Sequence, residues 1–107
     1  MTTMLLREVF DDDGRSAFGE WLDNLDVVPA AKVRVALARM SQGNLSAVKW
    51  FRGIGEYKID FGPGYRIYFA QEGKTILLLL AGGTKKQQQR DIEAAILQLA
   101  AYKARRK

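Results

Sequence analysis

The stretch YKIDFGPGYRIYFAQEGKTILLLL, residues 57–80, holds the pattern that decides the fold. Apolar and polar side chains alternate over residues 57–61 and again over 65–69, which predicts two half-buried β-strands. The Gly62-Pro63-Gly64 sequence between them predicts a turn. A second turn follows, and residues 76–80 are then apolar at every position, as in a strand covered on both faces. The stretch therefore predicts three antiparallel strands in succession.

The predicted hairpin also indicates which side chains share a face of the sheet. With a loop over residues 62–64, Asp60 lies opposite Arg66 and Lys58 opposite Tyr68. One face then carries a set of polar side chains: Glu56, Lys58, Asp60, Arg66 and Tyr68. Such a set indicates either a functional site on a rigid support or a solvated surface with one ion pair, worth only ~0–1 kcal/mol.

Helical and strand patterns flank this stretch. Residues 4–10 predict a first strand, and residues 14–25 predict a helix whose N-cap carboxylates come from Asp11 to Asp13. A second helix has Pro29 in its first turn, and a last helix begins near Thr84. The expected fold class is α+β, with helices packed on one face of a twisted antiparallel sheet. The chain length predicts one domain over residues 1–107.

Composition excludes several kinds of chemistry. The chain has no cysteine and no histidine, which removes disulfides, thiolate metal sites and the commonest acid–base side chain. No GxxxxGK[ST] phosphate loop is present. We therefore expect neither a metal nor a cofactor. The N-terminus lacks a signal-peptide pattern and no apolar run could span a bilayer, so we expect a cytoplasmic protein without a membrane partner.

The net charge of +5 is unevenly distributed. Residues 1–45 carry five basic and seven acidic side chains, whereas residues 46–107 carry twelve basic and five acidic ones. A basic C-terminal half favours a polyanionic partner or serves as a solubilising surface. Cleavage of RNA is compatible with this composition, because RNA supplies its own nucleophile, the 2′-hydroxyl. Lysine, arginine, tyrosine and carboxylate side chains can position it, move protons and stabilise charge on the phosphate.

Three segments together resemble a known family: FRGIGEYKIDFGPGYRIYF (residues 51–69), ILLLLAGG (76–83) and TKKQQQRDIEAAI (84–96). Over about residues 49–97 the chain is similar to the killer-protein branch of the RelE/ParE toxin superfamily, near the HigB-type toxins. The resemblance implies a RelE-like β-α-α-β-β-β-α order. It also implies a ribosome-dependent mRNA endoribonuclease, the toxin of a type II toxin–antitoxin module. Its partners would be the ribosome, mRNA and a cognate antitoxin, often one with a helix-turn-helix DNA-binding domain.

The same resemblance assigns roles to individual residues. Arg66 matches an arginine that contacts the scissile phosphate, and Lys58 matches a lysine that acts on the 2′-hydroxyl or on transition-state charge. Lys85 corresponds to a further basic residue. Asp91 stands where several relatives have Tyr or His, and it could be the general acid if its pKa were raised. Four further residues are expected to bind substrate: Arg52, Tyr68, Lys86 and Gln88.

One departure from the family pattern keeps other functions open. Asp60 stands where ribosome-acting relatives often have a second lysine, which weakens the positive site. The second hypothesis is therefore a non-enzymatic poison of DNA gyrase, like the ParE branch. The third is a degenerate module that is retained only to bind an antitoxin.

Overall fold

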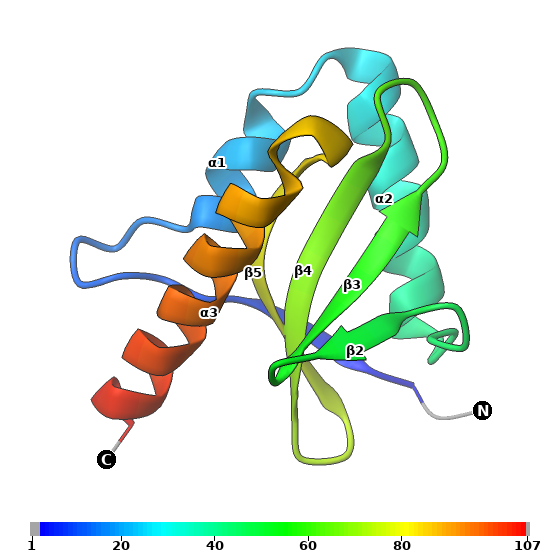
Figure 1. Cartoon of the computed structure of the whole chain (residues 1–107). Helices are drawn as coiled ribbons and strands as arrows, with labels where there is room; N and C mark the ends of the chain where they lie inside the picture. Colours follow the sequence, from blue (N-terminus) through cyan, green and yellow to red (C-terminus); the bar gives the residue numbers. More distant parts are fainter. Residues whose placement is uncertain (1–2, 107) are drawn as a thin grey trace.

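The computed structural model describes residues 3–106, which have an α+β fold with five strands and three α-helices (Figure 1). The elements follow one another in this order: β1 (Leu5–Glu8), α1 (Ala17–Asp23), α2 (Val27–Ser41), β2 (Lys49–Phe51), β3 (Ile54–Ile59), β4 (Tyr65–Glu72), β5 (Ile76–Thr84), a 3-10 turn (Lys85–Gln87) and α3 (Gln88–Arg105). The predicted strands and helices are all present. The short strand β2 was not predicted, because three residues are too few to show a period.

The sheet is mixed, with the strand order β1-β5-β4-β3-β2. Strands β2 to β5 are antiparallel neighbours, but β1 runs parallel to β5. The prediction of a wholly antiparallel sheet is therefore wrong at this edge. The parallel pairing follows from the path of the chain, because β2 runs opposite to β1 and three hairpins then reverse the direction three times. The last strand consequently runs alongside the first in the same direction.

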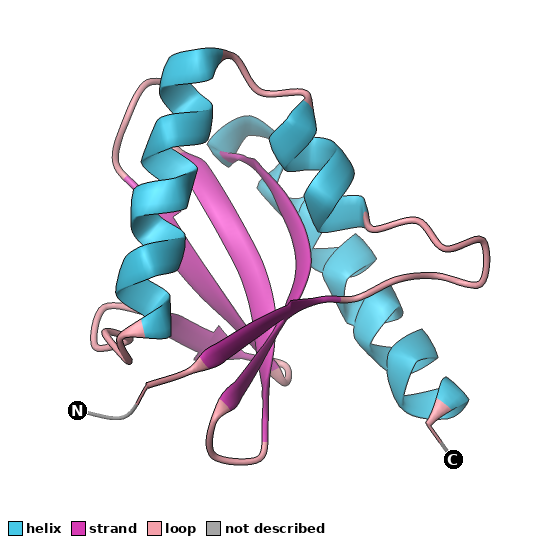
Figure 2. Ribbon diagram, turned by 180° about the vertical axis from the view of Figure 1, so that it is seen from behind, coloured by secondary structure: helices cyan, strands magenta, loops and turns pink. Residues whose placement is uncertain are grey.

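Helices cover both faces of the sheet, which corrects the prediction that they pack on one face (Figures 1 and 2). Helix α3 lies on one face and packs on β4 and β5, where Leu78, Leu80 and Ala95 are buried. Helices α1 and α2 cover the opposite face, where Ile67 and Phe69 are buried. We name these the α3 face and the α2 face. Apolar burial on both sides of β4 and β5 requires a cover on each.

Two helices begin later than predicted. Helix α1 has Ser16 as its N-cap, whose side chain accepts a hydrogen bond from the Gly19 amide at 2.9 Å. Asp11 instead accepts hydrogen bonds from backbone amides within its own loop. The side chain of Thr84 makes no capping bond, and a 3-10 turn separates it from Gln88, where α3 begins. Local polar turns therefore precede both helices.

The β3–β4 hairpin has a longer loop than predicted. Lys58 lies opposite Arg66, so the predicted pairing of Asp60 with Arg66 is wrong. Gly62 and Gly64 have φ angles of 54° and 79°, in the left-handed region that favours glycine, and they close the longer loop. The register is displaced by two positions, and alternate residues therefore stay on the predicted face. Asp60 lies outside the strand.

Among the described residues, no helix is both long and apolar enough to cross a membrane.

Candidate functional site

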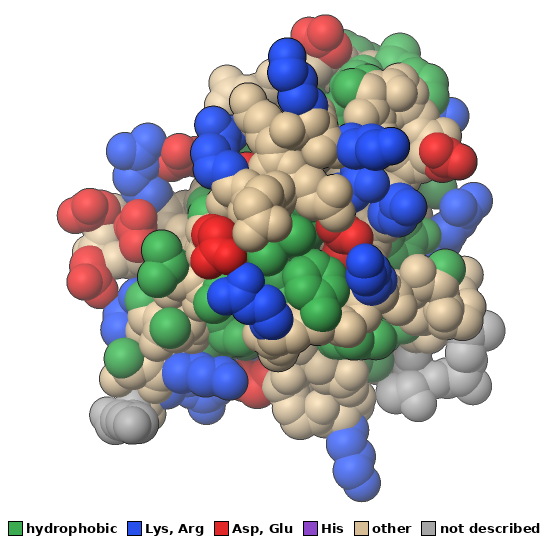
Figure 3. All heavy atoms as spheres, viewed as in Figure 1, with side chains coloured by type: hydrophobic (Ala, Val, Ile, Leu, Met, Phe, Trp, Pro, Cys, Tyr) green, Lys and Arg blue, Asp and Glu red, His purple; other side chains and the backbone are tan. Residues whose placement is uncertain are grey.

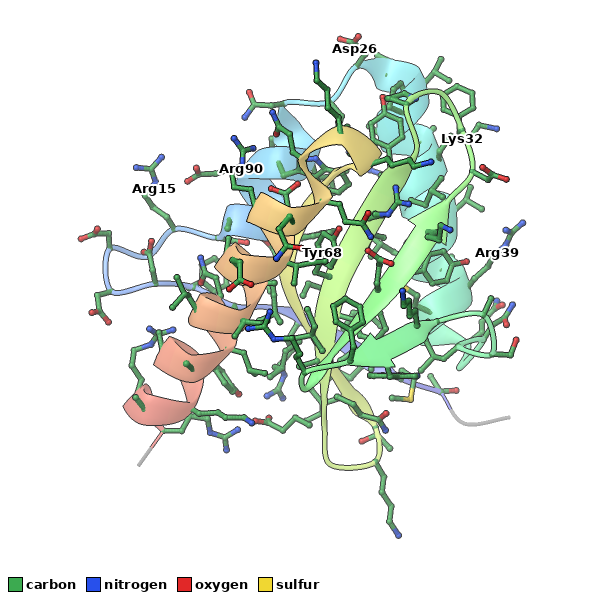
Figure 4. The ribbon with its side chains drawn as sticks, viewed as in Figure 1. Arg15, Asp26, Lys32, Arg39, Tyr68 and Arg90 are labelled. Atoms are coloured by element: carbon green, nitrogen blue, oxygen red, sulfur yellow. The ribbon has the colours of Figure 1, made fainter. Side chains whose placement is uncertain are left out.

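A row of polar side chains lies on the α3 face where β3 and β4 pair. Lys58 is opposite Arg66, and Glu56 is opposite Tyr68. Side chains directly opposite one another in antiparallel strands share a face and have Cβ atoms about 5 Å apart. Of the five residues predicted to share this face, these four do, and the prediction is wrong for Asp60, which lies beyond the end of β3. Figure 4 shows Tyr68 beneath the first turns of α3, at the centre of this region.

The central contact is a buried ion pair between Arg66 and Glu56. Arg66 Nε lies 3.4 Å from Glu56 Oε2, and the two side chains are only 5% and 2% exposed. Gln88, the first residue of α3, donates a hydrogen bond of 2.7 Å to the same carboxylate oxygen. In every other ion pair among residues 3–106, at least one partner is more than half exposed. The Arg66–Glu56 pair thus joins β3, β4 and the start of α3.

Tyr68 lies opposite Glu56 and inside the core. Its side chain is fully buried among the apolar residues under α3, and its hydroxyl has no hydrogen-bond partner in the described structure. Burial, followed by the negative charge of Glu56, raises the pKa of the Tyr68 hydroxyl. A fully buried ring cannot stack on a base, so the substrate-binding role expected for Tyr68 has no accessible surface in this structure.

The carboxylate of Asp91 occupies the space that a side chain at Gly83 would fill. Gly83 lies opposite Arg66 in the β4–β5 ladder, and a β-carbon at Gly83 would collide with the Asp91 carboxylate. Asp91 Oδ1 lies 3.6 Å from Arg90 Nε, while Oδ2 is buried without a hydrogen-bond partner in the part of the chain described. Burial raises the pKa of Asp91, an effect that Arg90 partly offsets. Because Gly83 has no side chain, the Asp91 carboxyl group can lie beside the point where Arg66 pairs with β5.

The loop carbonyl of Gly64 connects Arg66 to the turn before α3. It accepts a hydrogen bond of 2.8 Å from the Lys85 amide and one of 3.3 Å from Arg66 Nη1. The Lys85 side chain is exposed beside this contact, and so is that of Lys86. The two lysines are therefore held at the rim of the site by the 3-10 turn.

Two residues of the predicted set lie elsewhere. Arg52 is in the β2–β3 turn, at the opposite end of β3 from Lys58, and pairs with Glu93 of α3 at 2.7 Å. Asp60 faces a hollow beside α2, on the other side of the sheet. The structure thus brings together Lys58, Arg66, Lys85, Gln88 and Asp91, with Tyr68 below them and Lys86 at the rim.

Sequence reasoning placed Glu56 on the right face but gave it no role, and it missed Gly83. An acidic residue in an alternating strand looks the same whether it is solvated or buried with an arginine. The signal for Gly83 was the Gly-Gly pair after an apolar strand, which indicates a close approach of another segment.

The surface around the cluster is cationic. Figure 3 shows Lys and Arg side chains over β3, on the part of the α3 face that the helix leaves uncovered. Lys49 of β2, opposite Glu56, adds a further cation to this region. In the described range no three His, Cys, Asp or Glu side chains lie where they could hold a metal ion. The exposed lysines of this arrangement can bind an anion. Arg66 and the carboxyl group of Asp91, whose pKa is raised by burial, lie beneath them.

Comparison with known proteins gives one informative similarity. No protein-family model matches the chain. An uncharacterized protein of Haemophilus influenzae is 38% identical to it over 82 residues, which cover 75% of this chain and 83% of the relative. Identity at this level over most of both chains reflects a shared fold and common descent. The chain belongs to the same family as this Haemophilus influenzae protein.

Proposed function

We propose that the chain is the toxin of a type II toxin–antitoxin module and that it cleaves mRNA on the ribosome. The observation that carries the proposal is the Lys58–Arg66 row with Asp91 beside it. These groups supply positive charge for a phosphate and a carboxyl that holds its proton more tightly than usual. Two further observations support the proposal: the element order adds only β2 to the order expected from the resemblance, and the sequence holds the motifs GPGYR and K-x-x-Q-x-x-D-I.

The reaction uses the 2′-hydroxyl of the RNA as the nucleophile. Its oxygen attacks the adjacent phosphorus, the bond from phosphorus to the 5′-oxygen breaks, and a 2′,3′-cyclic phosphate remains on the upstream fragment. Lys58 and Lys85 are exposed and contact the phosphate first, while Arg66 stabilises the charge that develops on its oxygens. Because Glu56 already binds the guanidinium, a phosphate that contacts Arg66 competes with this carboxylate.

Protons must leave the 2′-hydroxyl and reach the departing 5′-oxygen. Burial raises the pKa of Asp91, which favours its protonated form and suits it to donate to the leaving oxygen. Lys58, on the exposed side of the row, accepts the proton of the attacking hydroxyl through the neutral form of its amine. Gln88 holds Glu56 and so fixes the carboxylate next to Arg66. An antitoxin and the ribosome are the protein partners of this proposal, and mRNA is its substrate.

The test is inducible expression of the wild type and of Arg66→Ala in a bacterial host. Growth is followed together with radiolabelled protein and DNA synthesis. The proposal predicts a rapid loss of protein synthesis with the wild type and none with Arg66→Ala. A control variant, Lys74→Ala in the exposed β4–β5 turn, should be as toxic as the wild type.

Other outcomes identify the other hypotheses. Arrest with translation intact and DNA synthesis failing would indicate a gyrase poison. Expression without any growth defect in a sensitive host would indicate an antitoxin-binding module without toxicity. An Arg66→Ala variant that still cleaves message on ribosomes would contradict the role of Arg66.

A further inference from the structure

A hollow of about 410 Å³ lies between α2 and the end of β3, on the α2 face. Its walls combine apolar and cationic side chains: Lys32, Val35, Arg39, Tyr57, Ile59 and Phe61. Its volume falls within the range of binding clefts in proteins, roughly 300–1,000 Å³. Lys58 also lines the hollow, and it is the one lining side chain that the RNA site proposed above uses.

One side of α2 forms an exposed ridge along this hollow. Val28, Lys32, Val35 and Arg39 follow at i, i+4, i+7 and i+11, so they lie on one side of the helix. Val28 is 56% exposed and Val35 is 49% exposed. The buried side of α2 is formed by other residues, Ala30, Val33, Ala36 and Met40. The ridge therefore presents apolar and cationic side chains in alternation to solvent.

The cations of the ridge have no acidic partner within residues 3–106. Lys32 Nζ lies 5.0 Å above the ring of Phe61, and neither Lys32 nor Arg39 takes part in an ion pair there. Asp60 is the one carboxylate lining the hollow. Figure 4 shows Lys32 and Arg39 on the same side of α2. Apolar contacts flanked by unpaired cations match a partner with apolar and acidic side chains.

The hollow and the α2 ridge beside it together form a groove. We propose that this groove binds an acidic amphipathic helix of a partner protein. The distance along α2 from residue 28 to residue 39 is about 16 Å at 1.5 Å per residue, which matches a helix of about three turns. Its apolar side chains would fill the space between Val35 and Phe61, and its carboxylates would meet Lys32 and Arg39. A second copy of the chain would bring cations against cations. An RNA strand would meet exposed valines and Asp60.

The groove and the Arg66 cluster share one residue, Lys58. Tyr57 and Ile59 line the groove and Glu56 belongs to the cluster, while Lys58 lines the groove and also lies opposite Arg66, so both surfaces depend on β3. A helix in the groove contacts the back of the strand that carries Lys58. Binding of this helix does not require that the cluster cleave RNA, so the two proposals can fail separately.

The test is a selection from a phage-displayed library of random 16-residue peptides against the full-length chain. Selected peptides should be rich in Asp and Glu, with apolar residues at helical spacing. Their affinity should fall at least tenfold for the double variant Lys32→Glu/Arg39→Glu. The control Lys74→Glu/Lys103→Glu makes the same change in net charge at exposed sites elsewhere, and affinity there should change less than twofold.

Backbone amide shifts of the ¹⁵N-labelled chain locate the bound peptide. The proposal predicts shifts that centre on residues 28–39 and 57–61. Binders without acidic bias, equal affinity for the two double variants, or no binders at all would overturn it. A concentration-dependent dimer that Lys32→Glu/Arg39→Glu strengthens, or a U-rich RNA hexamer that shifts the same amides, would assign the groove to another occupant.

Discussion

The two faces of β4 are both buried, yet they differ in chemistry. On the α2 face, Ile67 and Phe69 pack with apolar neighbours from α1 and α2. On the α3 face, the alternate residues Arg66 and Tyr68 bury a guanidinium and a hydroxyl next to Glu56. Apolar burial stabilises a fold by roughly 25 cal/mol per Å². A buried ion pair contributes little net stability, and apolar residues in its place are often neutral or stabilising. Apolar burial stabilises both faces, but only the α3 face adds a buried ion pair, and its charges are the ones that the proposed function uses.

The largest expected effect comes from breaking the buried ion pair on one side only. Arg66→Met leaves Glu56 buried without its cation, which should lower the free energy of unfolding by about 3–5 kcal/mol. The double variant Arg66→Met/Glu56→Met removes both charges and should recover most of that loss, while toxicity stays absent. Urea unfolding of the single and double variants measures the difference.

Ile67→Ala is the matched variant on the opposite face. It should cost about 2–5 kcal/mol through lost burial and a cavity, and the molecules that remain folded should stay active. For the ion pair, the contradicting result is a double variant Arg66→Met/Glu56→Met whose loss of unfolding free energy equals the sum of the losses of the two single variants. Such additivity would mean that Arg66 does not hold Glu56 in place.

The two glycines at the end of β5 sharpen the comparison. A methyl group at Gly82 would collide with the Trp21 ring on the α2 face, and one at Gly83 would collide with Asp91 on the α3 face. We expect Gly82→Ala to lower the free energy of unfolding by about 1–3 kcal/mol, because the partly buried Trp21 ring is packed against Phe18 and Tyr65 and has little room to move. Gly83→Ala should mainly displace Asp91 and reduce RNA cleavage. Thermal unfolding and cleavage rates of the two variants measure these effects. A greater loss of stability in Gly83→Ala together with a greater loss of cleavage in Gly82→Ala would disprove the roles given to the two faces.

The raised pKa of Asp91 predicts a smaller effect that depends on pH. The folded protein binds this proton more tightly than the unfolded chain does, because burial raises the pKa above its ordinary value of 3.8. The burial of Asp91 therefore reduces stability near neutral pH, and this reduction disappears as pH falls below 3.8. Asp91→Asn should raise the urea midpoint near neutral pH and leave it unchanged in acid.

Asp23→Asn, an exposed carboxylate of α1, provides the control for this pH series and should show no such difference. A lower midpoint for Asp91→Asn near neutral pH would mean that the ionised carboxylate stabilises the fold, which is incompatible with a pKa raised by burial.

The smallest effect is expected at Arg52. Its ion pair with Glu93 is half exposed on both sides, so Arg52→Ala should change the free energy of unfolding by about 0–1 kcal/mol. Because Arg52 lies at the far end of β3 from Lys58, message cleavage should be unaffected. A strong loss of cleavage would show that RNA extends along the whole of β3.

Periodicity predicted the strands and helices well, because each element needs an apolar side at a fixed spacing. It could not predict the direction of β1 or the cover on both faces, since these depend on the path of the chain between distant elements. The face shared by Lys58 and Arg66 followed from alternation and survived a shift in register. The burial of Arg66 with Glu56 and the approach of Asp91 to Gly83 could not be predicted, because both depend on where α3 packs.

The most direct measurement is cleavage of a ribosome-bound message by the purified chain, with a single 2′-deoxy nucleotide at the cut site. We expect the wild type to cut the all-RNA message, to leave a 2′,3′-cyclic phosphate and to fail at the deoxy position. Arg66→Met/Glu56→Met, although folded, should cut neither message. Cleavage at the deoxy position, or undiminished cleavage by the folded double variant, would contradict the claim that the charges of the α3 face act on RNA.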